Sequence, residues 1–283
     1  MSWAVTIDVA PVAYLQSHLG YSRFYTLLAD PSSGRPTVGG PIAPNYGSFY
    51  GIASANYLDV PVPESFASYV HSSLDSGAGS EFFTGTQFGR GAGVSNPYAE
   101  LVAHLRAFEQ LGVRYLVAGA HQPVVASVPG AQRVFDDGHV AIYELRAASS
   151  YFSTAGARCT LEVASRTQVT ATCAGPAALE RHELSFPGWH ASVNGHAVSI
   201  AAGPVPFMSL ALPPGRSVVT FGYEPTYVRA AEVLAFAALL TLAAPFVASA
   251  GPVRRRRRRG GPGGGDAACD GAADETGDGP GVT

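Results

Sequence analysis

The chain has 283 residues, of which 47% are apolar and only 14% are charged, against roughly 25% charged residues in an average soluble domain. Outside residues 254–283, which hold six of the 18 basic and five of the 21 acidic residues, 12 basic and 16 acidic residues remain. This mildly acidic balance argues against nucleic acid as a partner. The 33 Gly and 21 Pro indicate many turns, so strands joined by turns fit the composition better than long helices.

The first half of the chain alternates helix and strand patterns. Apolar residues at helical spacing predict helices over residues 11–19 and 96–112, the second with Asn96 as its cap and Pro97 in its first turn. Short apolar runs predict strands at residues 22–28, 113–119 and 139–145. We therefore expect residues 1–150 to form an α/β region with a small sheet.

The glycine-rich loop Gly89–Ser95 has two interpretations, a phosphate cradle and an ordinary flexible loop. No strand directly precedes it, and it has neither the GxGxxG spacing nor a GK[ST] ending, which favours the ordinary loop. The chain also lacks a nucleophile elbow, an HExxH motif and a carboxylate pair with catalytic spacing. We therefore predict no catalytic residue, no cofactor and no metal site.

The stretch Cys159–Cys173 predicts a β-hairpin centred on Arg166. Alternation places both cysteines on its apolar face and directly opposite each other, so they can form a cross-strand disulfide. The alternative is two buried free thiols that act as small hydrophobic residues. Cys269, alone in the C-terminal tail, is expected to be an unpaired thiol.

A second hairpin is predicted around Asn194-Gly195, the strongest two-residue signal for such a turn. In this register Trp189 becomes a core residue. The expected facing pairs are Val193 with His196, Ala191 with Val198, and Trp189 with Ile200.

Two further strands are predicted on either side of Pro213-Pro214-Gly215, with Val219, Phe221 and Tyr223 pointing inward. Together with the two hairpins they predict an antiparallel β-sandwich over residues 151–226. The fold class expected for the chain is therefore α+β: a small α/β layer, then the sandwich, then one C-terminal transmembrane helix.

The transmembrane helix is predicted over residues 227–253. Ala230 to Val253 contains one charged residue, Glu232, and about 20 residues at 1.5 Å each cross a hydrocarbon core of roughly 30 Å. A buried helix of a soluble core is the alternative. By the positive-inside rule, the six arginines Arg254–Arg259 place residues 254–283 in the cytoplasm and leave the preceding residues extracytoplasmic. This tail is expected to be disordered, because Gly260–Thr283 is Gly-rich and acidic and has no large apolar residues. Their alternative role, a nucleic-acid or nuclear-import patch, is disfavoured by the apolar segment directly before them.

Export of the folded residues needs an explanation, because Met1–Gly20 lacks the basic start and uninterrupted apolar core of a signal peptide. We expect either that the chain is the last part of a longer polytopic membrane protein, or that its true start lies further upstream. Translating the upstream DNA in frame distinguishes these cases from a chain that is complete.

The order of these elements resembles the C-terminal part of bacterial YfhO-like membrane proteins, relatives of membrane glycosyltransferases that use polyprenyl-phosphate sugars. The resemblance covers residues 12–250 and lies in a Pro-Gly-Trp, an Asn-Gly turn, a Pro-x-Gly turn and a Tyr-x-Pro before the last helix. These are Pro187, Gly188, Trp189, Asn194, Gly195, Pro213, Gly215, Tyr223 and Pro225. The family's catalytic acid lies on an early extracytoplasmic loop that has no counterpart here, so no catalytic residue is carried over.

The resemblance implies a role in glycosyl transfer to cell-envelope glycans at the cytoplasmic membrane, without catalysis by this chain itself. The implied partners are the lipid bilayer, an envelope glycan or lipid-linked sugar, and an upstream polytopic segment. Candidate glycan contacts are Tyr46, Phe49, Tyr50 and Tyr57, with ordinary packing as the alternative. Two other functions remain open: a free-standing membrane-anchored binding or scaffold module of the envelope, and a soluble hydrolase with a misinterpreted tail.

Overall fold

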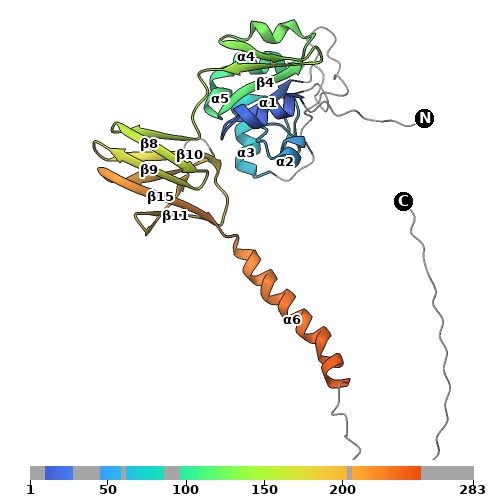
Figure 1. The fold of residues 1–283 in the computed structure, drawn as a ribbon, viewed down its shortest axis with the longest axis vertical. Helices are drawn as coiled ribbons and strands as arrows, with labels where there is room; N and C mark the ends of the chain where they lie inside the picture. Colours follow the sequence, from blue (N-terminus) through green and yellow to red (C-terminus); the bar gives the residue numbers. More distant parts are fainter. Residues whose placement is uncertain (1–9, 28–44, 59–61, 86–95, 203–205, 250–283) are drawn as a thin grey trace, which may run out of the picture. The chain divides into compact units, whose positions relative to one another are not determined.

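The computed structural model describes residues 10–27, 45–58, 62–85, 96–202 and 206–249, without the side chains of residues 46, 123, 124, 226 and 244–249. The chain divides into two compact units, Met1–Arg229 and Ala230–Thr283. The first unit, called the body below, combines helices with mostly antiparallel sheets, as expected for an α+β protein (Figure 1). The loop Gly89–Ser95 and Cys269 lie outside the described residues.

The first sheet of the body has four strands in the order β1-β4-β6-β5. They are β1 (Arg23–Leu27), β4 (Val113–Gly119), β5 (Ala131–Asp136) and β6 (Val140–Leu145). β1 runs parallel to β4, whereas β6 is antiparallel to both β4 and β5. The three predicted strands are confirmed. β5 was missed because it is an edge strand whose half-buried and exposed side chains form no apolar run.

Helices cover both faces of this sheet. α1 (Ala10–His18) packs on one face, where Val12 and Leu15 meet Phe24 and Ile142. The other face is covered by α3 (Glu64–Tyr69), the π-helical stretch η1 (Val70–Leu74), α4 (Pro97–Ala103) and α5 (Leu105–Gln110). The remaining elements of this region are α2 (Tyr46–Tyr50), the 3₁₀ turn η2 (Pro123–Ser127) and the strand pair β2 (Tyr57–Leu58) with β3 (Phe82–Phe83).

The helix predicted over residues 96–112 is in fact two short helices, α4 and α5. The side-chain oxygen of Asn96 accepts the N–H of Ala99 at 2.8 Å, so the predicted cap is confirmed. The helix is interrupted at His104, whose φ of −115° and ψ of 20° leave the helical range. Leu101 and Phe108 still point into the core, so the predicted apolar face survives the interruption.

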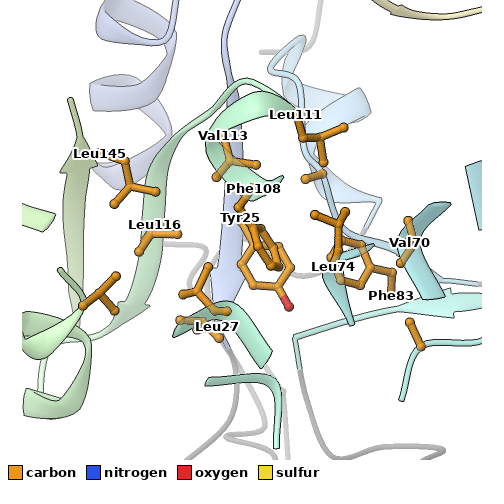
Figure 2. Packing of buried hydrophobic residues seen from close by; sticks show 14 of the residues in the cluster. Tyr25, Leu27, Val70, Leu74, Phe83, Phe108, Leu111, Val113, Leu116 and Leu145 are labelled. Carbon is orange, nitrogen blue, oxygen red and sulfur yellow. The ribbon is translucent and has the colours of Figure 1, made fainter. Parts of the chain in front are cut away.

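The core beneath α3, η1, α4 and α5 is built around three aromatic rings, shown in Figure 2. The ring centroids of Tyr25 and Phe108 lie 4.9 Å apart, those of Tyr25 and Phe83 5.1 Å apart, and all three side chains are fully buried. Aliphatic side chains such as Leu74 and Leu116 surround the rings. Because each ring removes a large apolar area from water, this cluster contributes strongly to the stability of the α/β region.

The second half of the body is a sandwich of two sheets. One has the order β13-β14-β10-β7 and the other β12-β11-β15-β9-β8. The strands are β7 (Phe152–Gly156), β8 (Cys159–Ser165), β9 (Gln168–Cys173), β10 (Ala177–Leu184), β11 (Trp189–Val193), β12 (His196–Val198), β13 (Ala201–Ala202), β14 (Phe207–Leu212) and β15 (Gly215–Tyr223). Val169, Leu179, Leu210 and Val219 form its core from both sheets.

The two predicted hairpins are present with most of their predicted register. Cys159 faces Cys173 across β8 and β9, and Val193 faces His196 across β11 and β12. The predicted pair of Trp189 with Ile200 is not part of the ladder, because β12 ends at Val198; on the other edge of β11, Trp189 pairs with Tyr223 of β15. Tyr223 was also expected to point inward, but it is 47% exposed because the sandwich core ends before the last residue of β15.

The second unit contains α6 (Thr226–Ser249), which begins within the last residues of the body and covers most of the segment for which a transmembrane helix was predicted. Among the residues that the structure describes, no helix is both long enough and apolar enough to cross a membrane. The expected arginine-rich tail, residues 254–283, lies outside the described residues.

Candidate functional site

Arg23, at the start of β1, connects the α/β region to the sandwich. Its guanidinium donates one hydrogen bond to the carbonyl oxygen of Leu111 at 2.9 Å and another to that of His182 on β10 at 2.8 Å. The carboxylate of Glu183 lies 3.5 Å away. Burial lowers the pKa of Arg23, and the nearby charge of Glu183 partly offsets this effect. Arg23 remains charged because the pKa of a free guanidinium lies far above neutrality.

The network continues from Glu183 into the sandwich through Tyr151. The phenol of Tyr151 donates to Glu183 at 3.0 Å and accepts the Nε–H of Arg181 at 3.1 Å. Burial, followed by the negative charge of Glu183, raises the pKa of Tyr151 to about 12. The phenol therefore stays protonated at neutral pH and keeps donating to the carboxylate.

Arg181 lies in the interior of the sandwich and is only 2% exposed. Its guanidinium carbon is 4.2 Å from the ring centroid of Trp189, 4.8 Å from that of Phe221 and 5.6 Å from that of Tyr151. Among the described residues, its Nη1 has no hydrogen-bond partner. The aromatic faces replace part of the lost hydration, since ring quadrupoles attract a cation.

Arg166 lies at the turn between β8 and β9 and faces the same junction. Its guanidinium carbon is 5.4 Å from the ring centroid of Tyr21 and 5.6 Å from that of Tyr151. Besides these ring contacts, the positive charge of Arg166 contributes to lowering the pKa of Arg23, and within the described part of the chain no carboxylate forms an ion pair with Arg166.

A cavity of about 230 Å³, called the junction cleft below, lies between these groups. Its polar wall contains Arg23, Ser54, Asn56, Arg166 and Glu183. Its apolar wall is formed mainly by Val62, Phe66, Leu111 and Leu184. Two guanidinium groups against one carboxylate give the polar wall a net positive charge, so the junction cleft can bind a small anion with an apolar body.

Asn56 fixes the shape of this wall. Its side-chain oxygen accepts the N–H of Thr26 at 2.7 Å, and its amide nitrogen donates to the carbonyl oxygen of Thr26 at 3.1 Å. Asn56 is buried, and its side chain forms the same two backbone hydrogen bonds that a neighbouring strand would form. It therefore holds its own part of the cleft wall against β1.

A second polar cluster, Ser153 with His182 and Glu180, has the residue types of a hydrolase triad. The hydroxyl of Ser153 is 3.1 Å from Nε2 of His182 and donates to Glu180 at 3.3 Å. In a triad the imidazole lies between the serine and the acid, whereas here the serine lies between the other two groups. Burial, and then the positive charge of Arg23, lower the pKa of His182, whose ring stacks on Phe207. The arrangement fits packing of β10 rather than nucleophile activation.

Two parts of the sequence signature, the Pro-Gly-Trp and the Tyr-x-Pro, meet at one end of the sandwich. The rings of Trp189 and Tyr223 lie 4.9 Å apart, and the N–H of Glu224 donates to the carbonyl oxygen of Gly188. Gly188 has a φ of 109°, and a Cβ at this position would lie 2.9 Å from the Glu224 oxygen and 3.0 Å from Cα of Pro225. Glycine is required here by both backbone conformation and space.

Asn194 and Gly195 form the tight turn between β11 and β12. Their φ values of 52° and 81° are those of a type I′ turn. The side chain and the backbone N–H of Asn194 also bond to the N–H and carbonyl of Val218 on β15, each at 2.8 Å. The turn is therefore attached to the neighbouring strand as well as closing its own hairpin.

The structure describes the side chains of three of the four predicted glycan contacts, Phe49, Tyr50 and Tyr57. Phe49 is 84% exposed and its ring lies 5.1 Å from that of half-buried Tyr50. Tyr57 is buried among Phe66 and Phe83, and its hydroxyl donates to the carbonyl oxygen of Gly79, so it packs as a core residue that also lines the junction cleft. The side chain of Tyr46 lies outside the described residues.

The structure joins Cys159 and Cys173 by a disulfide between β8 and β9. In the described ranges, no group of three or more His, Cys, Asp or Glu side chains is placed to hold a metal ion.

Sequence reasoning missed Arg23, Arg181 and Glu183 as site residues and treated Arg166 only as the centre of a hairpin. Charged residues inside the strand pattern of residues 177–184 were the available signal for Arg181 and Glu183. No local pattern connects either of them to Arg23.

No protein-family model, no curated protein and no solved structure matches this chain. The resemblance to YfhO-like proteins therefore rests on the sequence signature alone.

Proposed function

We propose that this chain is the extracytoplasmic C-terminal domain and last membrane helix of a YfhO-like membrane protein involved in glycosyl transfer to cell-envelope glycans, and that it is non-catalytic by itself. The observation that carries this proposal is the contact of Gly188 and Trp189 with Tyr223 and Glu224-Pro225. Each dipeptide alone is common in turns. The Pro-Gly-Trp and the Tyr-x-Pro meet in one cluster directly before α6, which gives these two parts of the signature a shared structural role.

The membrane helix is supported by the character of α6. After Arg229 and Glu232 in its first turns, its described side chains from Val233 to Ala243 are apolar except for Thr241, and large ones such as Phe236, Leu239 and Leu242 are each more than 60% exposed. A helix that is apolar all round is typical of a large protein core or a membrane span. These described side chains end at Ala243, and the proposed span adds the uncharged sequence from Ala244 to Val253.

The orientation is supported by charge and by redox chemistry. The six arginines Arg254–Arg259 follow the apolar run and are expected on the cytoplasmic side. The Cys159–Cys173 disulfide is typical of a compartment outside the cytoplasm.

Protease treatment of spheroplasts tests this proposal. The native protein, with an epitope tag after Thr283, should remain with membranes after alkaline washing. External protease should digest the body and spare the tag until the membrane is opened. An intact body with a digested tag would overturn the orientation, and release by the alkaline wash would overturn the span.

The second candidate function is a free-standing membrane-anchored binding or scaffold module. It is favoured by the body having its own hydrophobic cores and disulfide, which a self-contained module needs. The upstream DNA distinguishes the two: several apolar spans with an acidic outer loop support the first candidate, whereas an export signal supports the second.

A further inference from the structure

We propose that the junction cleft binds a single sugar ring bearing a carboxylate, and that Arg166 is the residue that binds the anion. The assignment of this sugar to an envelope glycan rests on the proposed function. The preference for a carboxylate comes from the cleft itself.

Arg166 is held in place without using its donors. Tyr21 and Tyr151 contact the guanidinium through their ring faces, at 5.4 and 5.6 Å from the ring centroids. Ring-face contacts leave the N–H groups of a guanidinium available in its plane. A planar fork of such donors matches the two oxygens of a carboxylate.

The other charges of the junction cleft are already engaged. Arg23 donates to two carbonyl oxygens and lies 3.5 Å from Glu183, which also accepts from Tyr151. Arg23 and Glu183 therefore balance each other, and the charge of Arg166 is the one left to be matched. A ligand with one negative charge matches it better than a phosphate ester, which carries nearly two at neutral pH.

The size and walls of the junction cleft favour one sugar ring. Its volume of about 230 Å³ is below the roughly 300–1,000 Å³ of pockets for drug-sized ligands. Val62, Phe66 and Leu184 offer an apolar surface to the C–H face of a ring, while Ser54 and Glu183 can bond to ring hydroxyls. The same site thus accepts both the apolar and the polar sides of a sugar.

Calorimetric titration of the full chain in detergent with D-glucuronate, D-glucose and glucose 1-phosphate tests this inference. Wild-type protein should bind glucuronate at least about tenfold more tightly than either of the other two sugars. Arg166→Gln should bind glucuronate no better than glucose. The matched control Arg158→Gln, an exposed arginine at the turn before β8, should retain wild-type affinity.

Arg166→Lys covers the case in which Arg166→Gln does not fold. It keeps the positive charge but loses the planar fork, so it should bind glucuronate more weakly than wild type and still better than glucose. Equal binding of glucose and glucuronate, preferential binding of glucose 1-phosphate, absence of binding by all three sugars, or an equal loss in Arg158→Gln would each overturn the inference. Glucuronate binding by a protein that does not fractionate with membranes would refute the proposed function alone.

Discussion

The α/β region and the sandwich bury their charged groups in different ways. In the α/β region the buried charged groups are carboxylates: Asp75 accepts a hydrogen bond from the N–H of Gly77, and Glu100 accepts one from the hydroxyl of Ser76. In the sandwich, the buried charge is the guanidinium of Arg181, and it is mainly surrounded by ring faces. A carboxylate needs donors to replace its water, whereas a weakly hydrated, flat guanidinium can be accommodated by aromatic rings. The sandwich can therefore hold a cation with few hydrogen bonds.

The largest expected effect is in the aromatic core of the α/β region. Phe108→Ala should lower the free energy of unfolding by about 3–5 kcal/mol, because it removes a fully buried ring that packs on Tyr25 and Phe83. Urea unfolding measures this change. Phe49→Ala, at an 84% exposed ring, is the control and should change stability by at most ~0.5 kcal/mol. If both variants lost a similar amount of unfolding free energy, the aromatic core would contribute no more to stability than an exposed ring.

In the sandwich, the disulfide should have the next largest effect. Replacing both Cys159 and Cys173 by alanine should lower the free energy of unfolding by about 3 kcal/mol, since the bond closes a loop of about 15 residues. Reductant should destabilise the wild-type protein by a similar amount and leave the double variant unchanged. A reductant effect that persists in the double variant would assign the stabilisation to another thiol.

A smaller effect is expected at the end of the sandwich. Gly188→Ala should be destabilising by about 1–3 kcal/mol, because it combines an unfavourable φ with a clash against the Glu224 carbonyl. Gly195→Ala is a matched control: its φ is also positive, but a Cβ there has open space. In thermal unfolding, the melting temperature of Gly188→Ala should be lower than that of Gly195→Ala. The reverse order would remove the steric explanation of the signature glycine.

The smallest effect sharpens the comparison of buried charges. Arg181→Met should change the free energy of unfolding by less than ~1 kcal/mol, since a thioether also packs well on aromatic rings and needs no desolvation of charge. Glu100→Met should be destabilising by about 1–3 kcal/mol, because the donors of Ser76 would be left without an acceptor. Equal effects of the two substitutions would mean that ring faces and hydrogen bonds compensate buried charge in the same manner.

The sequence predicts the local parts of this fold and not their assembly. The Asn194-Gly195 turn and the Cys159–Cys173 hairpin follow from alternation and turn chemistry within 15 residues. β14 and β15 were predicted as strands, but their sequence pattern does not report that they belong to opposite sheets. Sheet membership depends on partners distant in the sequence, which alternation does not report.

The junction cleft could not be predicted for the same reason. Arg23 and Glu183 are separated by 160 positions, and their contact depends on how the sandwich meets the start of β1. For Tyr57 the structure agrees with the alternative of ordinary packing, since its ring fills the α/β core.

The two carbonyl oxygens bound by Arg23 belong to the backbone, at Leu111 and His182. Every amino acid supplies that acceptor, so divergence at positions 111 and 182 leaves the bridge between the halves intact. Position 23 has no such freedom, because only arginine reaches both oxygens with a single rigid group. In relatives of this chain, covariation should therefore be sought between positions 23 and 183, where two side chains meet.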